Sequence, residues 1–210
     1  MYLSSAKVET VFEKVKQVKQ NKKLLCLSPD HVPVSIEDLQ YVIEDQYGWK
    51  ISKYEVSFSA DFLRGMVEKF NNGTANVYVG ANQSIAAQRF TAAKELAHIM
   101  IDEEEDWSPR GQATIDNLIV EEYVPSEPPR KAADGNIQSE ALAEIAAMEI
   151  LYPIEFREDD QKRVKSGEAT IPQISIHFNL PEFIVGKALN PSYANIAHQM
   201  WDRIGWPDRV

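Results

Sequence analysis

The sequence predicts an α+β domain, because three strand-like segments lie close together between segments with helical patterns. Residues 49–58, 62–70 and 74–80 are rich in aromatic and β-branched side chains, which is typical of strands. Helical patterns are clearest at residues 5–20 and 140–153. With 210 residues and 44% hydrophobic content, the chain is long enough to bury a sizeable core. We therefore expect the whole chain to form a single domain in which a small sheet packs on helices.

The N-terminal part of the chain predicts two helices separated by a short strand. Residues 5–20 place valines and a phenylalanine at helical spacing, opposite a face rich in lysine. The apolar run at 24–28 predicts a strand. Ser35 opens a capping-box pattern, and a helix is expected from there to Tyr47, with Gly48 as its stop.

A β-hairpin is predicted next. The letters Asn-Asn-Gly at 71–73 favour the positive φ values of a tight turn, and they join the segments 62–70 and 74–80. With residues 49–58 these segments would form three antiparallel strands. They are expected to lie beside a helix at 88–102.

Charge and composition exclude several classes of protein. The 22 basic and 32 acidic residues give a net charge of −10, which repels phosphate backbones and disfavours direct nucleic-acid binding. The lysine-rich stretch 14–23 is interpreted as a solvated helix face. No apolar run approaches the ~20 residues that cross a bilayer, and the N-terminus lacks a signal-peptide core, so a cytoplasmic location is expected. The single cysteine, Cys26, excludes an internal disulfide.

The helix predicted at 88–102 carries the pattern K-E-x-x-H at Lys94, Glu95 and His98. It differs by one letter from the H-E-x-x-H of zinc hydrolases, in which two histidines one turn apart bind the ion and the glutamate activates water. Positions 94 and 98 lie on the same helix face. A protonated lysine has no lone pair to donate to zinc. The pattern therefore indicates a peptidase scaffold that has lost one metal-binding side chain.

A second motif follows in EALAEIAAMEILYP, residues 140–153. Together with RFTAAKELAH it resembles the ImmA/IrrE family of metallopeptidases, in which R-F-T-x-A-H-E-L-G-H is followed by E-x-x-A-x-x-F-A-x-x-L-L-M-P. The matching positions are Arg89, Phe90, Thr91, Ala93, Glu95, Leu96, His98, Glu140, Ala143, Ala147, Leu151 and Pro153. The departures are Lys94 for histidine, Ala97 for glycine, Ala146 for phenylalanine, Ile150 for leucine and Tyr152 for methionine.

The resemblance implies a zincin-like fold, in which a small antiparallel sheet packs on a helical bundle that contains the active-site helix. It makes Glu95 the general base of an active enzyme, with His98 and Glu140 as remnants of the zinc ligands. It places Arg89 and Thr91 in the cleft or its structural support.

The resemblance also implies that residues 74–80 form an edge strand beside this helix. Zincins hold an extended substrate by adding it to such an edge. Tyr78 and Val79 are then expected to contact a bound polypeptide.

Two interpretations of the degenerate site remain open. Asp102, one turn beyond His98, could add to His98 and Glu140 an oxygen-rich ligand set that suits manganese, magnesium or calcium. Alternatively, no metal binds, and the ammonium of Lys94 supplies part of the missing charge between Glu95 and Glu140. The second interpretation predicts an ionic contact between Lys94 and Glu140.

Residues 104–136 are predicted to form a long surface excursion between the two motif helices. Four of the eleven prolines lie in this stretch. Its position allows two interpretations, a lid or wall beside the cleft and a mobile solvated insertion.

The sequence thus predicts a zinc-poor pseudo-enzyme, with no cofactor or a weakly bound metal, zinc if any. Its expected partner is a protein such as a transcriptional repressor in a phage, mobile-element or stress circuit, as the resemblance implies. One alternative is an active metallopeptidase with an unusual ligand set that cleaves such a repressor. Another is a self-association or toxin–antitoxin type interaction module.

Overall fold

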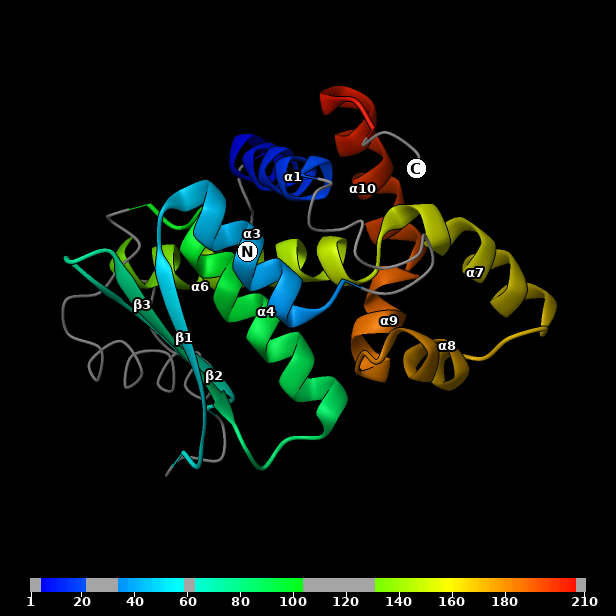
Figure 1. Cartoon of the computed structure of the whole chain (residues 1–210). Coiled ribbons are helices and arrows are strands. Elements are labelled where there is room, and N and C mark those ends of the chain that lie inside the picture. The colour runs from blue at the N-terminus through cyan, green and yellow to red at the C-terminus, as the bar shows by residue number, and fades with distance from the viewer. Residues whose placement is uncertain (1–4, 22–33, 59–62, 104–130, 207–210) are drawn as a thin grey trace.

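The computed structural model describes residues 5–21, 34–58, 63–103 and 131–206, with the backbone alone for 131–137. The predicted strand at 24–28 and most of the predicted excursion lie outside these ranges. The described residues form an α+β fold, as predicted, with a small sheet at one end and four C-terminal helices at the other (Figure 1).

Helix α4 (Ile85–Ile101) lies at the centre of this fold. It contacts α6 (Lys131–Leu151), α3 (Ile36–Tyr47) and the sheet, and almost every residue from Phe90 to Met100 is buried. A helix that is apolar around most of its circumference must be covered on all sides. The polar side chains of this segment are therefore held in the interior.

The two N-terminal helices have the predicted bounds. Helix α1 (Ser5–Gln20) buries one apolar stripe, and α3 begins after Ser35, whose hydroxyl accepts from the N–H of Asp38 at 3.0 Å. Gly48 ends α3 with a φ of 69°, in the left-handed region that glycine adopts without strain. The capping pattern in the sequence was therefore sufficient to place α3.

The lysines of α1 do not form the simple solvated face that their spacing predicts. Lys14 donates to the carbonyl of Met100 in the last turn of α4, and Lys16 donates to that of Ile204 at 2.8 Å, at the end of α10 (Pro191–Ile204). Carbonyls at helix C-termini lack partners within their own helix, and a lysine ammonium satisfies them. These two lysines therefore tie α1 to other helices.

The sheet has the strand order β1-β3-β2, with β1 (Lys50–Val56), β2 (Gly65–Phe70) and β3 (Thr74–Gly80). The predicted hairpin of β2 and β3 is confirmed, and Gly73 occupies its turn with a φ of 78°. The prediction of three antiparallel strands is wrong, because β1 pairs with β3 in parallel. The last strand of the three, β3, therefore lies between β1 and β2 and runs antiparallel to β2.

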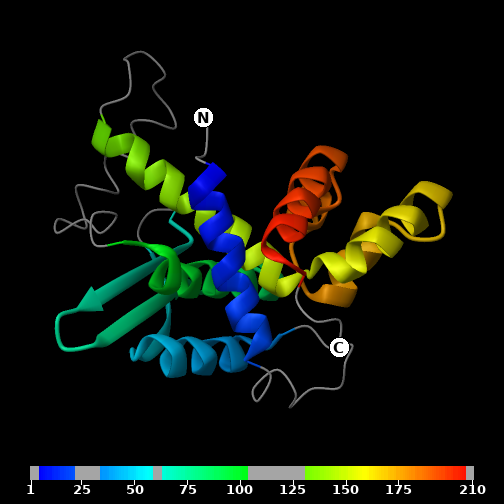
Figure 2. The ribbon, with the colours of Figure 1, turned by 90° about the horizontal axis from the view of Figure 1, so that it is seen from above.

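The C-terminal part consists of helices. Helix α6 begins at Lys131, so residues 131–136 are helical rather than part of a loop, which corrects the predicted end of the excursion. It ends just before Pro153, as predicted. Helices α7 (Ile154–Ser166), α8 (Ile171–Phe178) and α9 (Glu182–Ala188) follow and, with α10, lie on the side away from the sheet (Figure 2).

Within the described ranges, no helix combines the length and the apolar composition that a membrane span requires.

Candidate functional site

Helices α4 and α6 bring the two sequence motifs together. The Nζ of Lys94 lies 2.6 Å from Oε2 of Glu140 and 3.3 Å from Oε1 of Glu95. The contact with Glu140 joins residues 46 positions apart in the chain and is the ionic contact predicted from the sequence. The ammonium therefore lies between two carboxylates. Its contact with Glu95 is ionic only, because Oε1 accepts no hydrogen bond from any described residue.

His98 is held from both sides of its ring. Its Nδ1 lies 2.8 Å from Oδ2 of Asp102 and 3.2 Å from the hydroxyl of Ser139, which itself donates to Oδ1 of Asp102 at 2.7 Å. The Nε2 atom faces Oε1 of Glu140 at 3.4 Å, an ion-pair distance without hydrogen-bond geometry. Asp102 and Ser139 thus fix the ring so that Nε2 points towards Glu140.

Asp102 does not lie where it could bind the same metal ion as His98 and Glu140. It contacts Nδ1 of His98, whereas Glu140 faces Nε2 on the other side of the ring. The three side chains therefore do not converge on one point. Asp102 instead occupies the place of a carboxylate that orients a histidine.

Ser139 was missed at the sequence level. It is buried and bridges α6 to the C-cap of α4. The available signal was its place directly before Glu140, but a lone serine on a helix has no distinctive pattern.

The charges in the cluster stabilise one another. Burial alone would lower the pKa of Lys94, but the carboxylates of Glu95 and Glu140 outweigh it and raise that pKa. Burial would raise the pKa of Glu140, but contact with His98 and Lys94 holds it well below its usual range. The Glu140 side chain is still 44% exposed, so solvent screens part of this stabilisation.

His98 is expected to carry a proton in this environment. Burial alone would lower the pKa of its imidazole, but Asp102 and Glu140 outweigh burial and raise the pKa from 6.5 to about 10. The raised pKa favours the imidazolium form at neutral pH, in which both ring nitrogens are donors.

These residues do not fit a catalytic zinc ion. Such a site requires three protein ligands, and here Lys94 has no lone pair while Asp102 is directed at the wrong ring nitrogen. In the part of the chain that the structure describes, no group of three His, Cys, Asp or Glu side chains is arranged to hold a metal.

A pH dependence of stability follows from His98. Its folded pKa of about 10 lies above the ordinary value of 6.5, so its contribution is complete below pH 6.5 and is lost as the pH rises through 10. The loss is expected to reach about 1.4 kcal/mol per pH unit within that window. Urea unfolding at a series of pH values should show this slope. His98→Gln should flatten it, and an unchanged slope in that variant would assign the effect to another group.

Arg89 and Thr91, expected in or near the cleft, make structural contacts. Arg89 donates to the carbonyls of Val34 at 2.7 Å and Phe178 at 3.1 Å, which joins α4 to the start of α3 and the end of α8. Thr91 is buried and donates to Oε1 of Gln83 at 2.9 Å. Neither side chain contacts Lys94, His98 or Glu140 through any hydrogen bond or ion pair between described residues.

Tyr78 and Val79 do not lie at a sheet edge, which corrects their predicted role. They belong to β3, the central strand, which is paired with β1 on one side and β2 on the other. The edge strand that contacts α4 is β2. A polypeptide that extended this sheet next to the site would therefore pair with β2.

Glycine at position 65 allows β2 to lie close to α4. A Cβ atom there would be 2.4 Å from Cγ2 of Thr91 and 2.7 Å from Oε1 of Glu95. Real Cβ atoms essentially never approach other atoms so closely. The first residue of β2 therefore passes directly over Glu95 with only its backbone.

The backbone of β2 presents alternate residues to the edge that faces away from β3. Arg64 accepts from the N–H of Gly80 at 2.8 Å, so the register makes Met66, Glu68 and Phe70 the residues that bond to β3. The N–H and C=O groups of the residues between them point away from β3. No described strand pairs with β2 on that side.

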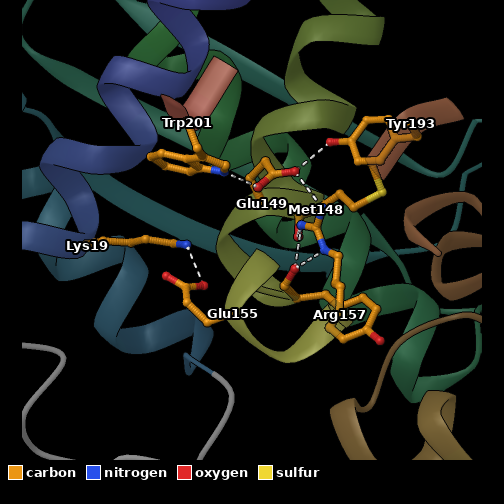
Figure 3. Close-up of polar contacts among 8 residues, drawn as sticks. Lys19, Met148, Glu149, Glu155, Arg157, Tyr193 and Trp201 are labelled. Carbon is orange, nitrogen blue, oxygen red and sulfur yellow. Dashed lines mark hydrogen bonds and ion pairs between the residues drawn. The ribbon is translucent and has the colours of Figure 1, made fainter. Parts of the chain in front are cut away.

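A second polar cluster surrounds Glu149 (Figure 3). Glu149 belongs to α6, the helix that also carries Glu140. The carboxylate of Glu149 is fully buried and accepts from Arg157 at 2.7 Å, Tyr193 at 2.7 Å and Trp201 at 3.1 Å. Burial would raise its pKa, but Arg157 outweighs burial and lowers it. Lys19 lies 3.4 Å from Glu155 at the border of the cluster.

The Glu149 cluster joins α6 to α7 and α10. Arg157 also donates to the carbonyl of Tyr152, and the ring of Trp201 packs edge-on against Phe12 of α1 with centroids 5.1 Å apart. The sequence analysis missed the Glu149 cluster because its members lie far apart in the sequence, and each of them has an ordinary role on a helix. All of its charges are paired within the protein, which indicates a structural rather than a binding role.

Comparison with known proteins gives a distant likeness to a solved structure. No protein-family model matches the chain, and no curated protein matches it. A solved structure, a Mycobacterium tuberculosis transcriptional regulator, is similar over 85% of this chain with 15% identity and a TM-score of 0.47. The chain spans 50% of the length of that regulator.

Proposed function

We propose that this chain is a degenerate ImmA/IrrE-like peptidase domain that binds a protein partner without cleaving it. The observation that carries the proposal is the position of Lys94, whose ammonium contacts Glu140 and Glu95. A cation on the protein itself then offsets the charge of carboxylates that would otherwise require a metal. The retained motifs support a family origin, and the lysine supports loss of the zinc chemistry.

The partner is proposed to add an extended segment to the edge of β2 that faces away from β3. This edge lies over α4, and its outward-directed backbone groups can pair with a strand without any catalysis. A transcriptional repressor is the proposed partner, as the resemblance to the ImmA/IrrE family implies. An acidic protein with a net charge of −10 would favour a basic partner of this kind.

A proline in β2 tests this mode of binding. Val67→Pro removes an N–H that points away from β3, so we expect it to weaken partner capture while the fold is retained. Val67→Ala controls for the lost packing of this partly buried side chain. Glu68→Pro removes an N–H that bonds to β3 and should disrupt the sheet. Capture from a host lysate with each variant as bait, with circular dichroism of each bait, provides the measurement.

The fate of the captured protein separates this proposal from the active-peptidase alternative. We expect the partner to be recovered intact, because the described residues offer no group of three side chains that could hold a catalytic metal. Cleavage that a chelator abolishes would instead establish an active metallopeptidase with an unusual ligand set. Capture that is unchanged in Val67→Pro would place the contact elsewhere on the surface.

A further inference from the structure

We propose that the face of the sheet turned away from α4 is an interaction surface that binds an arginine side chain of a protein partner. Glu68 pairs with the guanidinium, and the ring of Phe70 packs against it. This surface lies on the opposite side of the sheet from the cluster of Lys94 and Glu95. The inference therefore goes beyond the proposed function and does not depend on strand addition at β2.

The pairing registers define the residues of this face. Gly65 lies against Thr91 and Glu95 of α4, so Met66 and every second residue after it point to the other side of the sheet. The registers then place three rows of side chains there, which are Met66, Tyr78 and Tyr54, then Glu68, Asn76 and Ser52, then Phe70, Thr74 and Lys50.

Solvent reaches this face of the sheet. Tyr54 on β1 is 45% exposed, Phe70 on β2 is 42% exposed, and Glu68 between the rows of these two aromatic residues is also exposed. Asn76 and Tyr78 on the central strand are partly buried. A partner that covers Tyr54 and Phe70 removes large apolar rings from water, which favours association.

Glu68 is oriented before any partner binds. Its Oε2 accepts from the hydroxyl of Tyr78 at 2.8 Å, and Tyr78 in turn accepts from the amide of Asn76 at 3.0 Å. The Tyr78 ring stacks on Tyr54 of β1, with centroids 5.5 Å apart and planes at 23°. Side chains from the other two strands therefore hold the carboxylate on the sheet face. A basic group can bind it with little further loss of freedom.

The chemistry of this surface fits arginine. Glu68 accepts from a neutral hydroxyl, and no cation among the described residues pairs with it. Phe70 lies two positions further along the same face, which is about 7 Å in a strand. A guanidinium is planar, so it can lie on an aromatic ring and donate to a carboxylate at the same time. A lysine ammonium is more strongly hydrated and lacks this planar shape.

A nucleic acid fits this surface less well. It would bring phosphates towards the carboxylate of Glu68 on a chain of net charge −10. Among the described strand residues on this face, Lys50 alone is basic, and it lies on β1, across the central strand from Phe70. The charge next to the exposed Phe70 ring is therefore the negative charge of Glu68, which selects a cation.

A pair of small probes tests the proposal. Nα-acetylarginine amide and its citrulline counterpart have nearly the same shape, but citrulline is neutral. Each is titrated into the ¹⁵N-labelled full chain. The arginine probe should shift the backbone amides of Glu68 and Phe70 and the side-chain amide of Asn76. The citrulline probe should bind about threefold more weakly, or less tightly still, because it lacks the charge. Equal binding of both probes, or arginine shifts confined to other parts of the chain, would overturn the proposal.

Substitutions in the protein identify the groups that bind the probe. Glu68→Gln and Phe70→Leu should each weaken binding of the arginine probe about twofold to fivefold. Glu55→Gln is the matched control, because Glu55 is also an exposed strand glutamate but lies on the other side of the sheet, and its binding should equal that of the wild type. If the same amides shift with protein concentration alone, and Glu68→Gln abolishes that shift, the occupant is a second copy of the chain and the proposal is wrong.

Discussion

Glu149→Ala is expected to destabilise the fold by about 3–5 kcal/mol, the effect typical of breaking a buried ion pair by removing one partner. The Glu149 carboxylate is fully buried and accepts hydrogen bonds from Arg157, Tyr193 and Trp201. Without it, the guanidinium of Arg157 remains buried and loses its counter-charge. Because the cluster joins α6, α7 and α10, the loss should lower the stability of the whole fold.

Urea denaturation monitored by the fluorescence of Trp201 and the other tryptophans measures this loss. Glu149→Gln should be milder, because the amide oxygen still accepts a hydrogen bond. Asp159→Ala is the matched control, since Asp159 pairs with Lys162 at 3.0 Å but both side chains are more than 70% exposed. That control should change stability by less than about 1 kcal/mol. An equally small effect for Glu149→Ala would mean that the cluster is not the structural support described above.

Lys94→His is expected to convert the chain into one that binds a zinc ion. The substitution removes the ammonium between Glu95 and Glu140 and supplies the missing imidazole on the face of α4 that carries His98. Asp102 already contacts Nδ1 of His98 and would orient Nε2 for coordination. Zinc titration with a competing chromophoric chelator measures the gain.

Two controls define the cause of any zinc binding in that variant. Lys94→Met removes the charge without adding a ligand, so it should bind much less zinc than Lys94→His. His98→Ala in the Lys94→His background should abolish the gain. If Lys94→His binds no more zinc than the wild type, then Glu140 and His98 are not placed as ligands and the family origin of the site loses its main support.

The parts of this structure that local sequence determines were predictable. Ser35 and Gly48 fixed the ends of α3, and the letters at 71–73 fixed the hairpin, because caps and turns depend on neighbouring residues. These predictions required no knowledge of how distant segments pack. The contact between Lys94 and Glu140 was predicted in another way, from the resemblance of the two motifs to a family in which both positions belong to one metal site.

The parts that depend on tertiary arrangement were not predictable. The alternation of side chains along β1 and β3 does not reveal that these strands pair in parallel. Tyr78 and Val79 were therefore assigned to the edge of the sheet, a position that β2 occupies. Ser139 and Glu149 gain their roles only from partners on other helices. The lysines of α1 looked solvated because their acceptors, the C-terminal carbonyls of α4 and α10, are backbone groups that no sequence pattern reveals.

The zinc content of the wild-type chain tests the central claim most directly. The protein should be purified without chelator, incubated with zinc, passed through a desalting column and measured by elemental analysis. The ammonium of Lys94 between Glu140 and Glu95 predicts far less than one zinc ion per chain. One tightly held zinc ion per chain would contradict the claim that Lys94 takes the place of the metal.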